Sequence, residues 1–309
     1  MSESDNRRKV ISYRTRQSKS KVKPKSKTDK GDRHGSSGDS GDNIDLECDI
    51  VDMDNNRKHK IPDVTLIQQK LDPFRQRMLI KIKHIEDLIE IGQAYLDALV
   101  VYPECTEKHL KFTFHQFNSR RKIAMMITEL NDISRMIGMG KIKDQLVAQI
   151  AYLLSEQKQD ILMNIVLTGS PGSGKTSLAK LFGKAYYKSG ILRSNKFVCA
   201  NRAQLIGRYL GETAINTTAI FDSARGGVIF IDEVYSLGAA FDNGDCYSKE
   251  CIDTINLLLS ERPETMCIVA GYSNEIDKCF FSVNAGLKSR FPWHFDIDKY
   301  RSDDMVNIF

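Results

Sequence analysis

The sequence has no run of apolar residues close to the roughly 20 that a membrane-spanning helix needs, so we expect no membrane segment. Its seven cysteines are scattered, odd in number and without a C-x-x-C pair, which argues against a disulfide framework or a zinc site. The first ten residues lack the apolar stretch of a secretory signal. We therefore expect an intracellular protein with reduced thiols, in the cytoplasm or nucleus and not secreted.

Apolar and aromatic residues are also scarce at the N-terminal end, which carries most of the net charge of +5. Residues 1–35 are basic, and residues 36–56 are acidic without a single Lys or Arg. Because such blocks bury too little apolar surface to offset the entropy of ordering, we predict that residues 1–63 are disordered. The basic block could contact nucleic acid, act as a nuclear address, bind the acidic block or another acidic partner, or simply be a solvated tail, as charge runs usually are.

Helical periodicity begins at about Leu71, where apolar residues recur at spacings of three and four. A second helical run covers residues 106–136, and a third follows a glycine break. We predict a helical module over residues 71–135. Its aromatic stripe is expected to be part of a core rather than a ligand pocket; the stripe consists of Phe112, Phe114 and Phe117.

The pattern changes after Asp160, where short β-branched apolar runs alternate with helical stretches of 10–20 residues. The runs are "NIVLTG", "KFVCA", "GVIFIDE" and "MCIVAGY". This alternation predicts an α/β domain with a parallel sheet and crossover helices, and the uniformly apolar runs predict strands that are buried on both faces. We assign this domain to residues 136–309.

A glycine-rich stretch follows the first of these strands. The spacing Gly169-x-x-x-x-Gly174-Lys175-Thr176 fits the phosphate-binding P-loop, and an amphipathic helix follows it. Glycines let backbone N–H groups wrap phosphates, Lys175 would reach the β- and γ-phosphates, and the Thr176 hydroxyl would bind Mg²⁺. The N-terminus of the helix adds positive dipole to the same anion site.

Two carboxylates end the third apolar run, in "GGVIFIDEVYSL". A buried strand would place Asp232 and Glu233 at its C-terminal edge, beside the P-loop. Asp232 is expected to hold Mg²⁺ directly or through water, and Glu233 to polarise the attacking water. Burying both carboxylates without a metal would be costly, so a purely structural role is disfavoured. The pair favours nucleotide hydrolysis over phosphoryl transfer to a metabolite.

These features together resemble the AAA+ ATPases, and most closely the CbbX/CfxQ (CbxX/CfqX) family, over about Leu130 to Phe309. Further stretches carry the resemblance: "SRMIGMGKIKDQL", "LIGRYLGET", "IVAGYSNEID" and "NAGLKSRFPWHFDIDKY". It implies an AAA+ P-loop NTPase core with helices on both faces of a parallel sheet, and ATP and Mg²⁺ as ligands. It also implies a homo-oligomeric ring, expected to be a hexamer, that remodels a protein substrate as a chaperone or activase does.

The resemblance also assigns roles to single residues. Arg290 lies at the position of the arginine finger that reaches a neighbouring subunit, although a salt-bridging interface arginine is the plainer alternative. Arg208, Tyr209 and Leu210 match a pore loop, although an ordinary surface loop would fit too. The sensor position falls at Tyr272, Ser273 or Asn274, of which we favour Asn274. The expected nucleotide contacts are Ile137, Gly138, Gly169, Ser170, Pro171, Gly172, Ser173, Gly174, Lys175, Thr176 and Leu178.

The sequence departs from the resemblance at "RSDDMVNIF", where the family's helical lid would begin. We therefore expect the lid to be largely absent from this sequence, either because the polypeptide is truncated or because another chain or partner completes the site. Two other functions stay open. The basic tail would suit a nucleic-acid-associated ATPase, and the missing lid would suit a nucleotide-gated scaffold with little turnover. The sequence does not identify the protein substrate.

Overall fold

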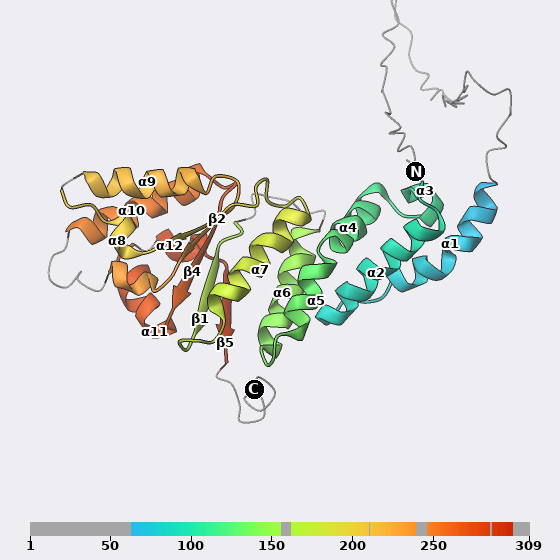
Figure 1. The fold of residues 1–309 in the computed structure, drawn as a ribbon, viewed down its shortest axis with the longest axis horizontal. Coiled ribbons are helices and arrows are strands. Elements are labelled where there is room, and N and C mark those ends of the chain that lie inside the picture. The colour runs from blue at the N-terminus through green and yellow to red at the C-terminus, as the bar shows by residue number, and fades with distance from the viewer. Residues whose placement is uncertain (1–62, 156–161, 210, 239–245, 285, 299–309) are drawn as a thin grey trace, which may run out of the picture. The chain divides into compact units, whose positions relative to one another are not determined.

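The computed structural model describes residues 63–155, 162–209, 211–238, 246–284 and 286–298 (Figure 1). The predicted disordered tail lies outside these ranges apart from Asp63, and so does the segment 299–309, where the lid would begin. None of the helices in these ranges combines the length and the apolar character needed to cross a membrane.

Within the described ranges, six helices precede the first strand: α1 (Val64–Met78), α2 (Ile85–Val101), α3 (Glu107–Leu110), α4 (Phe114–Met125), α5 (Ile127–Arg135) and α6 (Gly140–Leu153). Helix α1 begins seven residues before the predicted start, because the Asp63 carboxylate caps it by accepting a hydrogen bond from the Thr65 N–H at 2.9 Å.

The second predicted helical run is divided into α3, α4 and α5. Lys111 ends α3 in the left-handed conformation, with φ of 53°. The Thr113 hydroxyl then caps α4 by accepting a hydrogen bond from the Gln116 N–H at 3.2 Å. Of the aromatic stripe, Phe112 is buried, but Phe114 is 72% exposed at the start of α4, which corrects the expectation that all three rings belong to a core.

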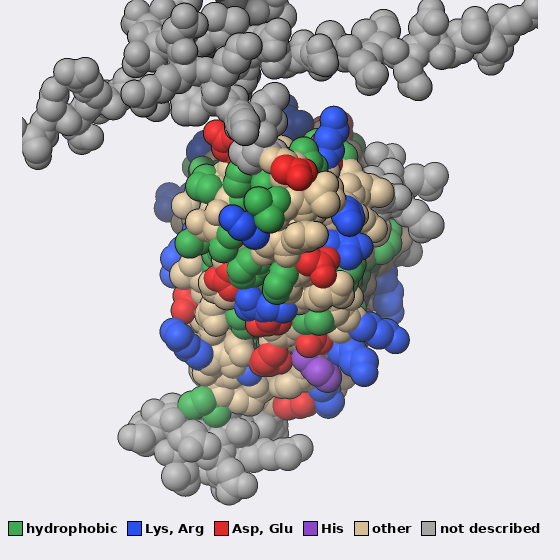
Figure 2. All heavy atoms as spheres, turned by 90° about the vertical axis from the view of Figure 1, so that its right-hand side faces the viewer, with side chains coloured by type: hydrophobic (Ala, Val, Ile, Leu, Met, Phe, Trp, Pro, Cys, Tyr) green, Lys and Arg blue, Asp and Glu red, His purple; other side chains and the backbone are tan. Residues whose placement is uncertain are grey.

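The helical segment formed by α1 to α6 carries charged and apolar side chains on its surface. Figure 2 shows basic, acidic and apolar side chains interspersed on the face that looks toward the viewer. The exposed apolar residues of the segment include Val100, which is 82% exposed at the end of α2.

A parallel five-stranded sheet forms the centre of the remaining chain, in the order β2-β3-β4-β1-β5. The strands are β1 (Ile165–Gly169), β2 (Phe197–Ala200), β3 (Val228–Ile231), β4 (Met266–Gly271) and β5 (Trp293–Ile297). Every neighbouring pair is parallel. The α/β fold and the four apolar runs predicted as strands are confirmed, and β5 adds an edge strand beside β1.

Helices cover both faces of the sheet, as predicted (Figure 1). Alternate residues of each strand point to opposite faces. On one face, Ile165 and Leu167 of β1 pack in a common core with α7 (Lys175–Lys188), α6 and α5. On the other face, Val166 packs with residues of α9 (Glu212–Ser223) and α10 (Cys246–Glu261). Short helices complete this side: α8 (Arg202–Leu205), α11 (Ser273–Ile276) and α12 (Gly286–Arg290).

The helical segment shares its core with the sheet. Leu88 of α2 and Leu130 of α5 are fully buried in the same cluster as Phe182 of α7. Beside this cluster, the buried Glu129 carboxylate pairs with Lys188 at the end of α7, with Oε1 and Nζ 2.7 Å apart. A division of the chain between residues 135 and 136 stays a prediction.

Candidate functional site

The loop between β1 and α7 is shaped for a bound anion. Gly174 adopts a left-handed conformation (φ 89°), which a glycine tolerates without strain, and it leads directly into α7. The first N–H groups of a helix have no partner within the helix, and they carry its positive dipole end. The Lys175 side chain turns toward the start of the loop, where its Nζ donates hydrogen bonds to the carbonyl oxygens of Gly169 and Ser170, both at 2.9 Å.

Two carboxylates follow the buried strand β3. The Asp232 Oδ1 accepts a hydrogen bond from the Glu233 N–H at 3.0 Å, which fixes the backbone where the strand ends. Glu233 has a left-handed backbone with φ of 48°, a conformation that costs a residue other than glycine about 1 kcal/mol or more. Such strained positions often occur at functional sites.

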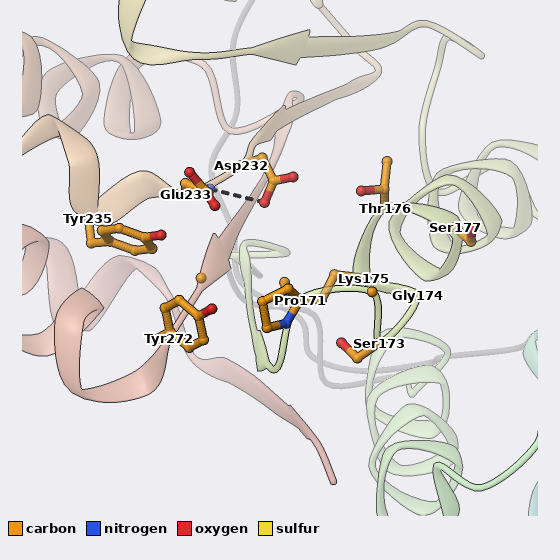
Figure 3. Close-up of a pocket in the computed structure, with 12 residues that line it drawn as sticks. Pro171, Ser173, Gly174, Lys175, Thr176, Ser177, Asp232, Glu233, Tyr235 and Tyr272 are labelled. Carbon is orange, nitrogen blue, oxygen red and sulfur yellow. Dashed lines mark hydrogen bonds between the residues drawn. The ribbon is translucent and has the colours of Figure 1, made fainter. Parts of the chain in front are cut away.

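A cavity of about 360 Å³ joins these two strand ends. Figure 3 shows Asp232 and Glu233 on one side of it and Thr176 on the other. Because the C-terminal ends of parallel strands meet at one edge of a sheet, the P-loop and the two carboxylates could be predicted from the sequence to lie together. The cavity is lined by Pro171, Gly172, Ser173, Gly174, Lys175, Thr176, Ser177, Asp232, Glu233, Tyr235, Gly271 and Tyr272.

Two tyrosines form one wall of the cavity: Tyr235, which the sequence did not point to, and Tyr272, one of the three candidates for the sensor position. The rings of Tyr235 and Tyr272 have their centroids 5.8 Å apart. Burial raises the pKa of Tyr235, and the nearby negative charge of Glu233 raises it further. An adjoining hollow shares both rings and is also lined by Ser273, Asn274 and Glu275, so Asn274 lies next to the cavity rather than in it.

Other predicted contact residues do not line the cavity. Gly169 and Ser170 turn their carbonyl groups to Lys175, and Leu178 is fully buried in the core. Ile137 and Gly138 precede α6, and they are absent from the cavity lining. Their assignment to an adenine site stays a prediction.

Arg290 lies at the other end of the sheet. It ends α12 just before β5, whose first residue, Trp293, pairs with Ile165 at the start of β1. Ile165 lies four residues before Gly169, where the P-loop begins, which corresponds to about 13 Å along the strand. The Arg290 guanidinium donates hydrogen bonds to the Ser260 hydroxyl at 2.8 Å and to the Gly286 carbonyl at 2.9 Å. Arg290 therefore does not belong to the cavity of its own chain.

The predicted pore loop is exposed. Tyr209 is 75% exposed, and Arg208 is also exposed, whereas Leu210 lies outside the described residues. Oε2 of Glu212 accepts hydrogen bonds from the backbone N–H groups of Arg208 at 2.7 Å and Tyr209 at 3.2 Å. This cap fixes the loop to the first turn of α9 and leaves the Tyr209 ring free of the core.

The donor set at the cavity fits Mg²⁺ bound together with phosphates. Within the described ranges, no cluster of three or more His, Cys, Asp or Glu could hold a metal ion without other ligands. Mg²⁺ in nucleotide sites needs no such cluster, because waters and phosphate oxygens supply most of its ligands. One carboxylate and one hydroxyl, from Asp232 and Thr176, are the protein groups that such a site requires.

The comparisons with known proteins point to one family. The family model described as "ATPase family associated with various cellular activities (AAA)" matches residues 165–298. The cfxQ-like protein R730 of Acanthamoeba polyphaga mimivirus is 36% identical over 217 residues, which cover 69% of this chain and 53% of that protein. The resemblance expected from the sequence is thereby confirmed.

Two further relatives are similar over a shorter range. Stage V sporulation protein K of Bacillus subtilis is 33% identical over 57% of each chain. The ESX-3 secretion system protein EccA3 of Mycobacterium leprae is 33% identical over 61% of this chain and 30% of its own length. The present chain therefore matches about half or less of the length of these relatives. A solved structure of the FIGL-1 AAA domain with ADP covers 48% of this chain and 47% of its own at 20% identity, with a TM-score of 0.34, too low to support an argument.

Proposed function

Because residues 165–298 form an AAA ATPase domain, we propose that this chain binds ATP with Mg²⁺, hydrolyses it, and uses the cycle in a ring of identical subunits to remodel another protein. The observation that supports this most directly is one cavity that brings together the P-loop lysine and hydroxyl, from the start of α7, with two carboxylates that follow β3.

Each side chain at the cavity has a role that its chemistry suits. Lys175 and the N–H groups at the start of α7 would hold the phosphates, leaving the carbonyl groups that Lys175 now contacts. Thr176 and Asp232 would hold Mg²⁺, which when bound neutralises phosphate charge. Glu233 would accept a hydrogen bond from the attacking water and orient it, because its carboxylate faces the cavity from the strained turn after β3.

The position of Arg290 supports the ring. An arginine that is about one strand length away from its own cavity cannot assist hydrolysis there, but a neighbouring subunit could present the same residue to the next cavity. Two of the relatives are named for sporulation and for a secretion system, so we carry over the chemistry of the family and not the substrates of its members. The exposed Tyr209 would contact the protein substrate, because an aromatic ring binds polypeptide without reading its sequence.

Lys175→Ala tests the phosphate site. We expect ATP affinity to fall about 10- to 100-fold, because charge-assisted hydrogen bonds to the phosphates are lost. Titration calorimetry of the folded variant measures this, and Lys184→Ala, at an exposed position on the same helix, is the matched control. Equal ATP affinity in Lys175→Ala and wild type would contradict the phosphate role.

Tyr209→Ala tests the separation of substrate contact from chemistry. ATP affinity and basal turnover should stay within about twofold of wild type, because the exposed ring lies apart from the residues that line the cavity. Work on a protein partner should be lost. Steady-state ATPase assays with and without the partner provide the comparison, and loss of ATP binding in this variant would instead place Tyr209 at the nucleotide.

A further inference from the structure

Arg202 does not line the cavity, yet its side chain makes several hydrogen bonds. It is the first residue of α8, and its side chain is half-buried. Its Nη1 donates hydrogen bonds to the carbonyl oxygens of Ser236 at 2.7 Å and Leu237 at 3.1 Å, and to the Ser248 hydroxyl at 2.9 Å. One guanidinium nitrogen thus joins α8 to the chain segment after β3 and to α10.

The segment that Arg202 holds is the short 3₁₀ helix η1 (Val234–Leu237), which starts immediately after Glu233. Tyr235 of η1 lines the cavity. The Ser236 N–H donates to the Glu233 carbonyl at 2.8 Å, so η1 continues directly from the strained glutamate backbone. A movement of the Glu233 backbone would therefore act directly on η1.

η1 also packs against the π-helical turn η3 (Asp277–Phe281). Gly238, just after η1, packs so closely on this turn that a Cβ atom at that position would lie 1.5 Å from the Cys279 carbonyl oxygen. Because there is no room even for a Cβ atom, the two backbone segments cannot approach much further. η1 is therefore in close contact with η3 and is bonded through its carbonyl groups to Arg202, so a displacement of η1 would act on the Arg202 side chain.

The helix that carries Arg202 leads to the exposed loop. Helix α8 ends at Leu205, and residues 206–209 follow it as far as Tyr209. The Leu205 carbonyl accepts a hydrogen bond from Thr217 of α9 at 3.4 Å, and the Gly207 N–H donates to Thr213 at 3.0 Å. The loop continues directly from α8 and both are bonded to α9, so a shift of α8 would act on the backbone of the loop.

We propose that Arg202 is a positioning residue that couples the nucleotide cavity to the Tyr209 loop, by transmitting displacement of η1 to α8. This rests on the proposed function, because the cavity must bind nucleotide for η1 to respond. The three acceptors of Arg202 belong to Ser236, Leu237 and Ser248, none of which lines the cavity. Arg202 therefore acts through η1 and Glu233, and not on the phosphates directly.

The experiment compares hydrogen exchange in the full chain with and without a non-hydrolysable ATP analogue and Mg²⁺. In the wild type, peptides covering η1 and the Tyr209 loop should both change their exchange on binding. In Arg202→Gln the η1 peptide should still respond and the loop peptide should not, with analogue affinity within about twofold of wild type. Arg202→Lys keeps the charge and part of the donor capacity, so it should restore part of the loop response.

The control is Arg225→Gln, which removes a guanidinium that is 68% exposed and bonded to Glu264, and which should behave as wild type. A loop response in Arg202→Gln equal to wild type would overturn the coupling, as would a wild-type loop that is unchanged while η1 responds. If Arg202→Gln does not fold, Arg202→Lys decides between the same outcomes. A wild-type chain that does not bind the analogue would overturn the proposed function, and the coupling with it.

Discussion

Arg290→Ala should lower ATP turnover by about 10³- to 10⁵-fold in the assembled ring while leaving ATP affinity unchanged. The arginine lies at the end of the sheet opposite the P-loop of its own chain, so its removal takes nothing from that chain's phosphate contacts. The substitution does remove a positive charge from the cavity of the neighbouring subunit, which Arg290 would face across the interface. Calorimetric ATP binding and single-turnover hydrolysis measure the two quantities separately.

A mixture of subunits makes this expectation specific to a ring. Arg290→Ala and Lys175→Ala are each expected to be inactive, but an interface that joins an intact P-loop to an intact arginine should hydrolyse ATP. Mixing them should therefore restore part of the activity, provided that sedimentation shows assembly and that both variants melt as wild type does. Lys288→Ala, an exposed residue on the same helix, is the control. A mixed assembly as inactive as its components would contradict the shared site.

Glu233→Gln should lower turnover by about 10²- to 10⁴-fold and keep ATP binding. The amide is nearly the size of the carboxylate, but it cannot withdraw a proton from the attacking water. Lys175, Thr176 and Asp232 remain to hold the phosphates and the metal ion. The separation between binding and turnover is the diagnostic result, and it also supplies a variant that should retain ATP and a bound protein substrate together.

The matched control for this change is Glu275→Gln, since Glu275 lines the adjoining hollow and not the cavity itself. It should keep turnover within about twofold of wild type. Near-normal turnover in Glu233→Gln would show that another group orients the water. A loss of nucleotide binding would instead place Glu233 among the groups that hold the phosphates or the metal.

The parts of the site that sequence could predict are those set by strand direction. The apolar runs before Gly169 and Asp232 are recognisable as buried parallel strands, and such strands end at the same edge of a sheet. That geometry alone brings the lysine and the two carboxylates into one cavity. The strand predictions succeeded for the same reason, because burial on both faces leaves a continuous apolar signal.

Other features depend on contacts that leave no periodic signal. Tyr235 and Tyr272 form a wall of the cavity because two separate strand ends bring their rings together. Arg202 binds carbonyl oxygens 34 and 35 residues away, and every residue type offers a carbonyl. Phe114 was expected in a core on hydrophobicity alone, yet the Thr113 cap starts a helix there and leaves the ring facing solvent.

The core shared by α2, α5, α7 and the sheet has a mechanical consequence. Helix α7 begins at Lys175 in the P-loop and ends about 20 Å further along at Lys188. The Lys188 side chain forms an ion pair with Glu129 of α5. A close-packed interior resists sliding, so we expect this segment and the P-loop to move together. In the ring that we propose, an optical label on α2 should therefore report any rotation of the P-loop.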